Sequence, residues 1–98
     1  MYLTAKRYEG VIDLEQVGQR VSEGLDRMMR ELPGFVSFYC VEADDNVLMT
    51  TSVFETQRGA EESDRREAVW ASENLGFLVP DPPQITAGEV VANRGRMP

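Results

Sequence analysis

Residues 35–54 read FVSFYCVEADDNVLMTTSVF. Two runs rich in β-branched and aromatic residues, 35–42 and 47–54, flank the short polar segment 43–46. Such runs favour β-strands, and a polar turn with Asp and Asn between them is typical of a hairpin. Apolar residues fall on both faces of each strand, whereas a strand with one face in water alternates with polar residues. We therefore expect both faces of this hairpin to be covered.

The segment before the hairpin predicts a helix. Asp13 is a suitable N-cap, with Gln16 three residues later in capping-box spacing. The apolar residues that follow lie on one face of a helix, and Pro33-Gly34 ends it. These apolar positions are Leu14, Val17, Val21, Leu25, Met28, Met29 and Leu32.

The outer segments extend the pattern on both sides. Residues 2–8 predict a strand, and Thr56 caps a second helix that runs to about Leu75, where Gly76 supplies a stop. After it we expect a Pro-rich connection, a last strand and a frayed polar tail, at residues 77–83, 85–92 and 93–98.

The predicted order β-α-β-β-α-β is the split βαβ of a ferredoxin-like α+β fold. Right-handed crossovers place the two helices on one face of a four-stranded antiparallel sheet. The length of 98 residues suits one domain, 1–98. Because two helices cover only one face of the sheet, we expect a second copy of the chain to cover the other. The sequence thus predicts a homodimer packed sheet to sheet.

Composition argues against several classes of function. Seventeen acidic and ten basic residues give a net charge of −7, so nucleic acids and anionic membranes are poor partners. There is no histidine, which removes His-ligated metal sites and His-dependent catalytic triads. Cys40 is the only cysteine, and we assign no disulfide and no metal site. We see no signal peptide or membrane span and expect a cytoplasmic location.

With this element order, the passages 32–35 (LPGF), 53–56 (VFET) and 83–90 (PQITAGEV) carry a family resemblance. The chain resembles the antibiotic-biosynthesis-monooxygenase-like group of the dimeric α/β-barrel superfamily over nearly its whole length. The resemblance implies a ferredoxin-like dimer. Members of the group include cofactor-independent oxygenases of aromatic polyketides and haem-degrading enzymes, and a shared fold does not choose between them.

One branch of the group fits poorly. Its haem-degrading members use an Asn on the first strand, a Trp on the second helix and a His near the end of that helix. Here Lys6 stands about where the Asn would be, Trp70 matches the Trp, and no His exists. The cofactor-independent oxygenases remain compatible, because they need a pocket, a base and hydrogen bonds; we therefore expect no cofactor.

The second predicted helix supplies candidate catalytic residues. Ser63, Glu67, Trp70 and Asn74 follow i, i+4, i+7, i+11 spacing beside a stripe of small residues, which leaves room for a pocket. Trp70 would form an aromatic wall, Asn74 would donate a hydrogen bond to an oxyanion, and Glu67 would accept a proton. In the alternative interpretation Trp70 only anchors the helix, and Glu67 and Asn74 face solvent.

The strands supply candidate substrate-binding residues. Lys6 shares one face of the first strand with Tyr2, Thr4 and Tyr8, and under a pocket it would hold a phenolate or enolate. The alternative is that its stem snorkels to solvent. Tyr39 is a possible hydroxyl donor, or a tyrosine buried at the sheet or an interface. Cys40 is most simply a small buried apolar residue.

Two functions from different classes remain. The first is a cofactor-independent monooxygenase acting on a small aromatic or quinol-like compound, which would be deprotonated and then reduce O₂ itself in a dry pocket. The alternative is a homodimer of the same fold that binds a small molecule or serves a structural role without turnover.

Overall fold

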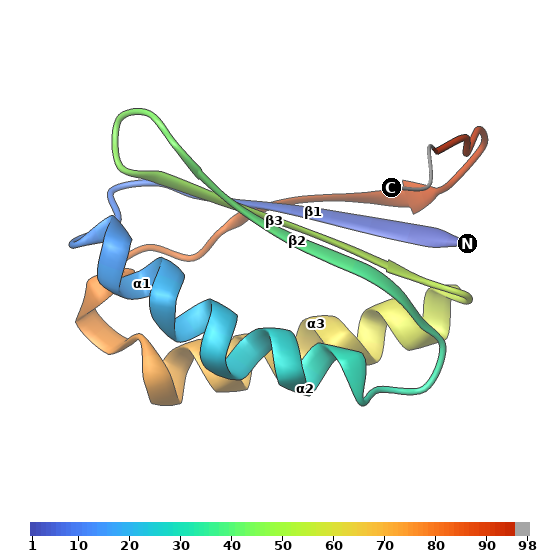
Figure 1. The fold of residues 1–98 in the computed structure, drawn as a ribbon, viewed down its shortest axis with the longest axis horizontal. Helices are drawn as coiled ribbons and strands as arrows, with labels where there is room; N and C mark the ends of the chain where they lie inside the picture. Colours follow the sequence, from blue (N-terminus) through green and yellow to red (C-terminus); the bar gives the residue numbers. More distant parts are fainter. Residues whose placement is uncertain (96–98) are drawn as a thin grey trace.

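The computed structural model describes residues 1–95. Within them, four strands form one antiparallel sheet in the order β2-β3-β1-β4, so β1 lies between β3 and β4. The helices lie against one face of this sheet (Figure 1), and the predicted ferredoxin-like α+β fold is confirmed. The strands are β1 (Tyr2–Tyr8), β2 (Phe35–Ala43), β3 (Val47–Phe54) and β4 (Gln84–Glu89).

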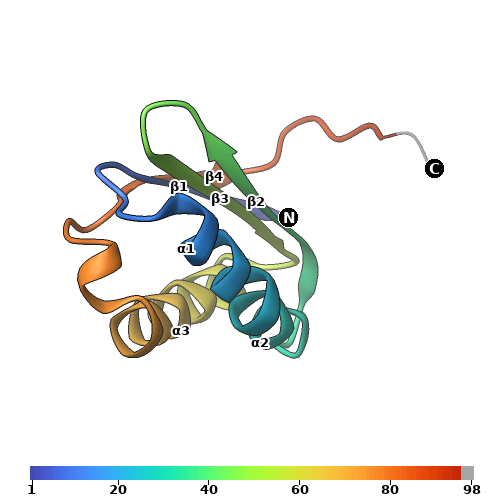
Figure 2. The same ribbon diagram turned by 60° about the vertical axis from the view of Figure 1, so that its left-hand side comes forward.

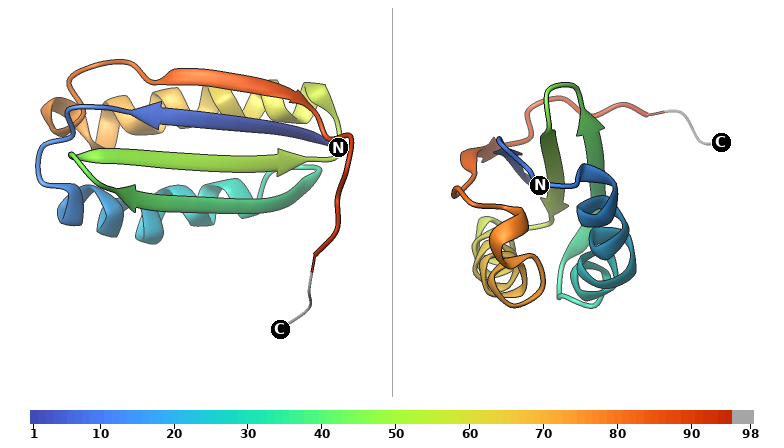
Figure 3. Two further views of the ribbon diagram at one scale, coloured as in Figure 1. Left: turned by 90° about the horizontal axis from the view of Figure 1, so that it is seen from above. Right: turned by 90° about the vertical axis from the view of Figure 1, so that its left-hand side faces the viewer.

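The helical layer has two parts that lie side by side and run in opposite directions (Figure 1). The first is a continuous rod made of α1 (Leu14–Arg20), the π-helix η1 (Val21–Leu25) and α2 (Asp26–Arg30). The second is α3 (Gln57–Asn74), followed by the 3₁₀ turn η2 (Gly76–Leu78). Viewed end-on in the right panel of Figure 3, both parts lie on the same side of the sheet; the left panel shows the opposite face with no helix over it.

The π-turn η1 was not predicted from the sequence. Val17, Val21, Leu25 and Met29 are each at most 2% exposed, although each lies four residues after the last. In a regular α-helix that spacing rotates the side chain by about 40° per step, so the four would drift off one face. A π-turn has i→i+5 hydrogen bonds and more residues per turn, which brings all four back towards the sheet.

The last strand is shorter than predicted. It ends at Glu89 instead of residue 92, because Glu89 already pairs with Tyr2, the first residue of β1. One more hydrogen bond joins the Val90 amide to the Met1 carbonyl at 2.8 Å, after which the chain leaves the sheet and Val91 is 95% exposed (Figure 2). Of the tail predicted to fray, residues 93–95 have no regular structure, and 96–98 lie outside the described residues.

No helix within residues 1–95 is both long and apolar enough to cross a membrane. The cytoplasmic location stays a prediction.

The helix-facing side of the sheet buries an unusual number of polar side chains. Thr4, Thr50, Ser52 and Lys6 are each at most 4% exposed, beneath α3. The hydroxyl of Thr4 has no hydrogen-bond partner among the described residues, whereas that of Thr50 donates to Glu67. A buried hydroxyl without a partner costs about 1–3 kcal/mol.

Replacing Thr4 with valine, which keeps its shape, is therefore expected to raise the free energy of unfolding by about 1 kcal/mol. Urea denaturation followed by circular dichroism measures the change. Thr50→Val is the matched control, since it has the same chemistry on the neighbouring strand but removes a hydrogen bond, and it should destabilise. A loss of stability in Thr4→Val would mean that its hydroxyl is satisfied.

Candidate functional site

The centre of the candidate site is Lys6 on β1. Side chains alternate along a strand, so Tyr2, Thr4, Lys6 and Tyr8 all point towards the helices. Because β1 lies inside the sheet, with Thr50 on one side of Lys6 and Ile85 on the other, the lysine stem has no short path to water. Lys6 is 4% exposed. The alternative that this lysine snorkels to solvent is thus wrong.

Two carboxylates on α3 neutralise the buried ammonium of Lys6. Its Nζ lies 3.3 Å from Asp64 Oδ1 and 3.4 Å from Glu67 Oε2. The carboxylates are three residues apart, which puts both on the face of α3 that meets the sheet. Glu67 is 2% exposed, while the side chain of Asp64 keeps 28% of its surface in solvent. Glu67 is thus shielded from solvent, whereas Asp64 is partly accessible.

Glu67 is held by hydroxyl groups as well as by Lys6. The Tyr8 hydroxyl donates a 2.5 Å hydrogen bond to Glu67 Oε2, and the Thr50 hydroxyl donates a longer one of 3.4 Å to the same oxygen. Burial, followed by the charge of Glu67, raises the pKa of Tyr8 well above its usual value. Tyr8 is thus a fixed donor that keeps Glu67 in place behind Lys6.

A cavity of about 410 Å³ opens beside this cluster, within the size range of small-molecule sites. It lies between α3, strands β1 and β4, and the segment 79–83. Lys6, Tyr8 and Asp64 line it together with Ser72 and Asp81, and the remaining lining is mostly apolar. Those other residues are Ala68, Ala71, Gly76, Val79, Pro80, Pro82, Pro83 and Ile85.

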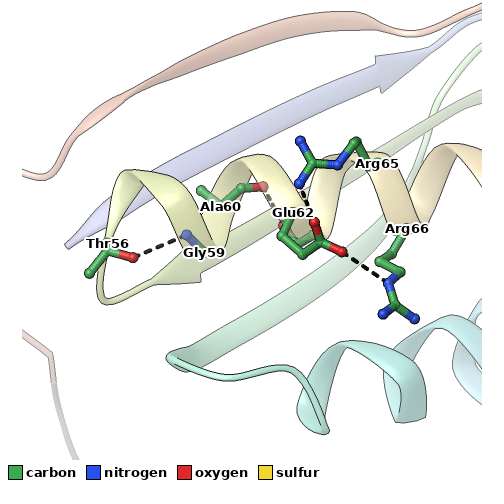
Figure 4. A network of polar contacts seen from close by, with 7 residues as sticks. Thr56, Gly59, Ala60, Glu62, Arg65 and Arg66 are labelled. Atoms are coloured by element: carbon green, nitrogen blue, oxygen red, sulfur yellow. Dashed lines mark hydrogen bonds and ion pairs between the residues drawn. The ribbon is translucent and has the colours of Figure 1, made fainter.

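Polar contacts stabilise the first turns of α3 (Figure 4). The Thr56 hydroxyl accepts a 3.0 Å hydrogen bond from the Gly59 amide and caps the helix. Glu62 accepts hydrogen bonds from Arg65 and Arg66, which hold the pKa of its carboxyl below the usual value. These contacts lie within residues 56–66 and thus support the part of α3 that carries Asp64.

The structure separates the residues that the sequence grouped on α3. Glu67 joins Lys6, as a site under α3 requires, but it lies behind Lys6 and Tyr8 and does not line the cavity. Trp70 and Asn74 lie on the side of α3 that faces η1, beside Gly24, and neither lines the cavity. The expectation that Trp70 forms a cavity wall is therefore corrected.

Trp70 instead packs between the two helical parts. A Cβ atom on Gly24 would lie 2.9 Å from Trp70 Cζ2, so the glycine allows this close approach. The Asn74 side chain is also occupied, because its Nδ2 donates to the Trp70 carbonyl at 2.9 Å. Trp70 thus matches the anchoring alternative, and Asn74 is exposed, away from the cavity.

The candidates on β2 lie outside the cavity too. Tyr39 pairs with Thr51 on the sheet face opposite the helices and is 66% exposed. Cys40 points the other way and packs against the core. Burial, followed by the nearby charge of Glu42, raises the pKa of the Cys40 thiol to about 11, which keeps it protonated and unreactive at neutral pH.

Sequence reasoning missed Asp64, Tyr8, Thr50 and Asp81 as site residues. A signal for Asp64 was present, since it lies three residues before Glu67 on the same helix face. Tyr8 shares the face of Lys6 by strand alternation. Nothing local marked Thr50 or Asp81, which reach the site through strand pairing and through the path of the 79–83 segment.

The raised pKa values of Tyr8 and Cys40 predict alkaline destabilisation. Both groups keep their protons to higher pH in the folded chain than in the unfolded chain, where the values are near 10.0 and 9.0. The two groups therefore contribute their full stabilisation of the folded chain below about pH 9. Above that pH, each group that loses its proton only in the unfolded chain lowers the free energy of unfolding by about 1.4 kcal/mol per pH unit. Tyr8→Phe should flatten the decline above pH 10, measured by urea denaturation. An unchanged decline in Tyr8→Phe would contradict the assignment.

Solved structures of other proteins share the fold of this chain. No protein-family model matches the sequence, and no curated protein does either. A Nitrosomonas europaea protein provisionally assigned as an antibiotic biosynthesis monooxygenase superposes with a TM-score of 0.77 at 12% identity, over 96% of this chain and 93% of its own. A monooxygenase from Streptomyces coelicolor in complex with nanaomycin D gives 0.70 at 16% identity, over 98% and 89%. A variant of SnoaB, a cofactor-independent oxygenase from Streptomyces nogalater, gives 0.73 at 8% identity, over 94% of each chain. These TM-scores show a common fold, and identities this low show nothing beyond it: the chain has the fold of the antibiotic-biosynthesis-monooxygenase-like proteins.

Proposed function

We propose that the chain is a cofactor-independent monooxygenase that oxidises a small phenol or quinol-like aromatic compound. The observation that supports this proposal is the Lys6–Asp64 ion pair, 3.3 Å long, on the lining of a largely apolar cavity of about 410 Å³. The pair offers a base and a cation side by side, which are the two groups needed to make and hold a phenolate. The fold shared with oxygenases is consistent with it.

The reaction would begin when the phenol gives its proton to the Asp64 carboxylate. The Lys6 ammonium then holds the phenolate, and Glu67, kept in place by Tyr8, acts as a positioning residue for Lys6. The electron-rich ring attacks O₂ through a C–H carbon, and a new C–O bond forms. The resulting peroxide anion takes the proton back from Asp64 and becomes a ring hydroperoxide. Loss of water breaks the O–O bond and leaves a quinone. One oxygen atom enters the product, the other leaves as water, and the substrate supplies all four electrons.

Oxygen uptake tests this proposal. The purified protein is incubated with naphthols and dihydroxynaphthalenes, and O₂ consumption is followed with an electrode. We expect uptake above the protein-free rate for at least one compound, with one quinone formed per O₂. Isotopically labelled O₂ should place one labelled atom in the product. If no compound is oxidised faster with protein than without it, the proposed activity is wrong.

The second candidate is a binding protein without turnover. The packing of Trp70 against η1 favours it, because the sequence interpretation relied on an aromatic wall for catalysis, and Trp70 does not supply one. Calorimetric titration with the same compounds separates the two functions. Heat of binding without O₂ uptake would support the binding protein.

We further propose that two copies pair through the open sheet face. Leu3, Val53, Tyr39 and Val41 lie on this face, and the last two are 66% and 52% exposed. Exposed apolar patches of this kind are typical of protein interfaces. Light scattering coupled to gel filtration should give about twice the chain mass of 11.0 kDa. Tyr39→Glu should shift the protein towards the monomer, and a single monomeric species in the unaltered chain would contradict the pairing.

A further inference from the structure

We infer that the cavity accepts aromatic ligands that are neutral or carry a cationic amine, and rejects those that carry a carboxylate or sulfonate. The inference rests on the proposed function for the location of the site. Its test measures binding alone, so it does not depend on turnover.

The charge of the site carries the inference. Among the described residues that line the cavity, Lys6 is the one cation, and Asp64 and Asp81 are the anions, which leaves one net negative charge. Glu67 does not line the cavity, but its Oε2 lies 3.4 Å from Lys6 Nζ and adds a second net negative charge to the site. Tyr8 adds none, because its phenol stays protonated under burial and the Glu67 charge. The surroundings of the cavity are therefore negative despite the lysine.

Lys6 is not a free cation for an incoming anion. Its Nζ already contacts carboxylates at 3.3 Å and 3.4 Å, and a ligand carboxylate would have to compete with both. A phenolate made inside the site is different, because its proton moves to Asp64 and removes one negative charge as another forms. The total charge is then unchanged. A ligand that brings its own fixed anion adds to the repulsion.

Asp81 gives the site its preference for a cation. It lines the cavity from the segment 79–83 and has no ion-pair partner in the part of the chain that the structure describes. Pro80, Pro82 and Pro83 surround it and restrict the backbone. Asp81 is exposed and lines the cavity, so its carboxylate is available to a ligand amine.

Calorimetric titration with three compounds of one shape tests the inference. The probes are a naphthol, an aminomethyl-naphthol and a hydroxynaphthoic acid, at low salt. The acid should bind on the order of tenfold more weakly than the naphthol, and the amine at least as tightly. Asp81→Asn should weaken only the amine, by about twofold to fivefold, the size expected for an exposed ion pair. Asp44→Asn removes the same charge at the hairpin turn and is the control.

Each outcome is decisive. An acid that binds as tightly as the naphthol would overturn the inference, and so would an Asp81→Asn variant that behaves like Asp44→Asn. If none of the three compounds binds, both this inference and the proposed site fail. If the predicted order of affinities is found but no compound consumes O₂, the inference stands and the oxygenase activity fails.

Discussion

Lys6→Met is expected to lower the free energy of unfolding by about 3–5 kcal/mol. Methionine fills much of the space of the lysine stem but leaves Glu67 charged and 2% exposed without its cation. Removal of one partner of a buried ion pair has this large effect because the other charge stays out of water. Urea denaturation followed by circular dichroism measures the loss.

Two further variants make the Lys6 experiment specific. Arg7→Met is the neighbouring change on the opposite sheet face, where Arg7 and Glu9 form an exposed ion pair, and it should alter stability by less than about 1 kcal/mol. Lys6→Met combined with Glu67→Gln removes both buried charges and still offers Tyr8 an acceptor, so most of the stability should return. A single Lys6→Met variant as stable as Arg7→Met would contradict the buried pair.

Asp64→Asn is expected to reduce the rate of substrate oxidation by about 10²–10⁴-fold, the range for loss of a general base. Asparagine has nearly the same shape but cannot accept the phenol proton. The side chain is 28% exposed, so the fold should tolerate the change. The measurement is the initial rate of O₂ uptake with the best substrate from the naphthol panel.

The pH dependence separates a base from a merely structural residue. At higher pH the phenol ionises in solution and no longer needs Asp64. The difference in the rate of O₂ uptake between the unaltered chain and Asp64→Asn should therefore become smaller. Glu73→Gln, an exposed change on the same helix, is the control and should keep full activity. A variant with normal rates at neutral pH would remove Asp64 from the mechanism.

The candidate site was only partly predictable from the sequence. Glu67 could be chosen because it faces the sheet at helical spacing from Ser63, and Lys6 because it shares a strand face with Tyr8. Which carboxylate is open to a ligand was not predictable, since Asp64 and Glu67 both lie on the inner face of α3. The difference arises from β1, whose Lys6 and Tyr8 cover Glu67 and leave Asp64 at the cavity.

Trp70 shows where helical spacing misleads. Its place beside a stripe of small residues suggested a pocket wall, but spacing does not tell which neighbour a flank of the helix meets. The answer depends on the other helical part, where Gly24 in the π-turn leaves space for the indole ring.

The sequence by itself determined the order of the elements and their bounds near the hairpin. Local chemistry is enough there: Asp45 and Asn46 tolerate the positive φ of 59° that each adopts in the turn, and Asp13 and Thr56 cap the helices. The tertiary structure decided where β4 stops, which face of β2 meets the helices, and which charges share the cavity. Those outcomes depend on pairing between residues far apart in the chain, such as Tyr2 with Glu89 and Lys6 with Asp64, and no local pattern encodes the register of such pairs.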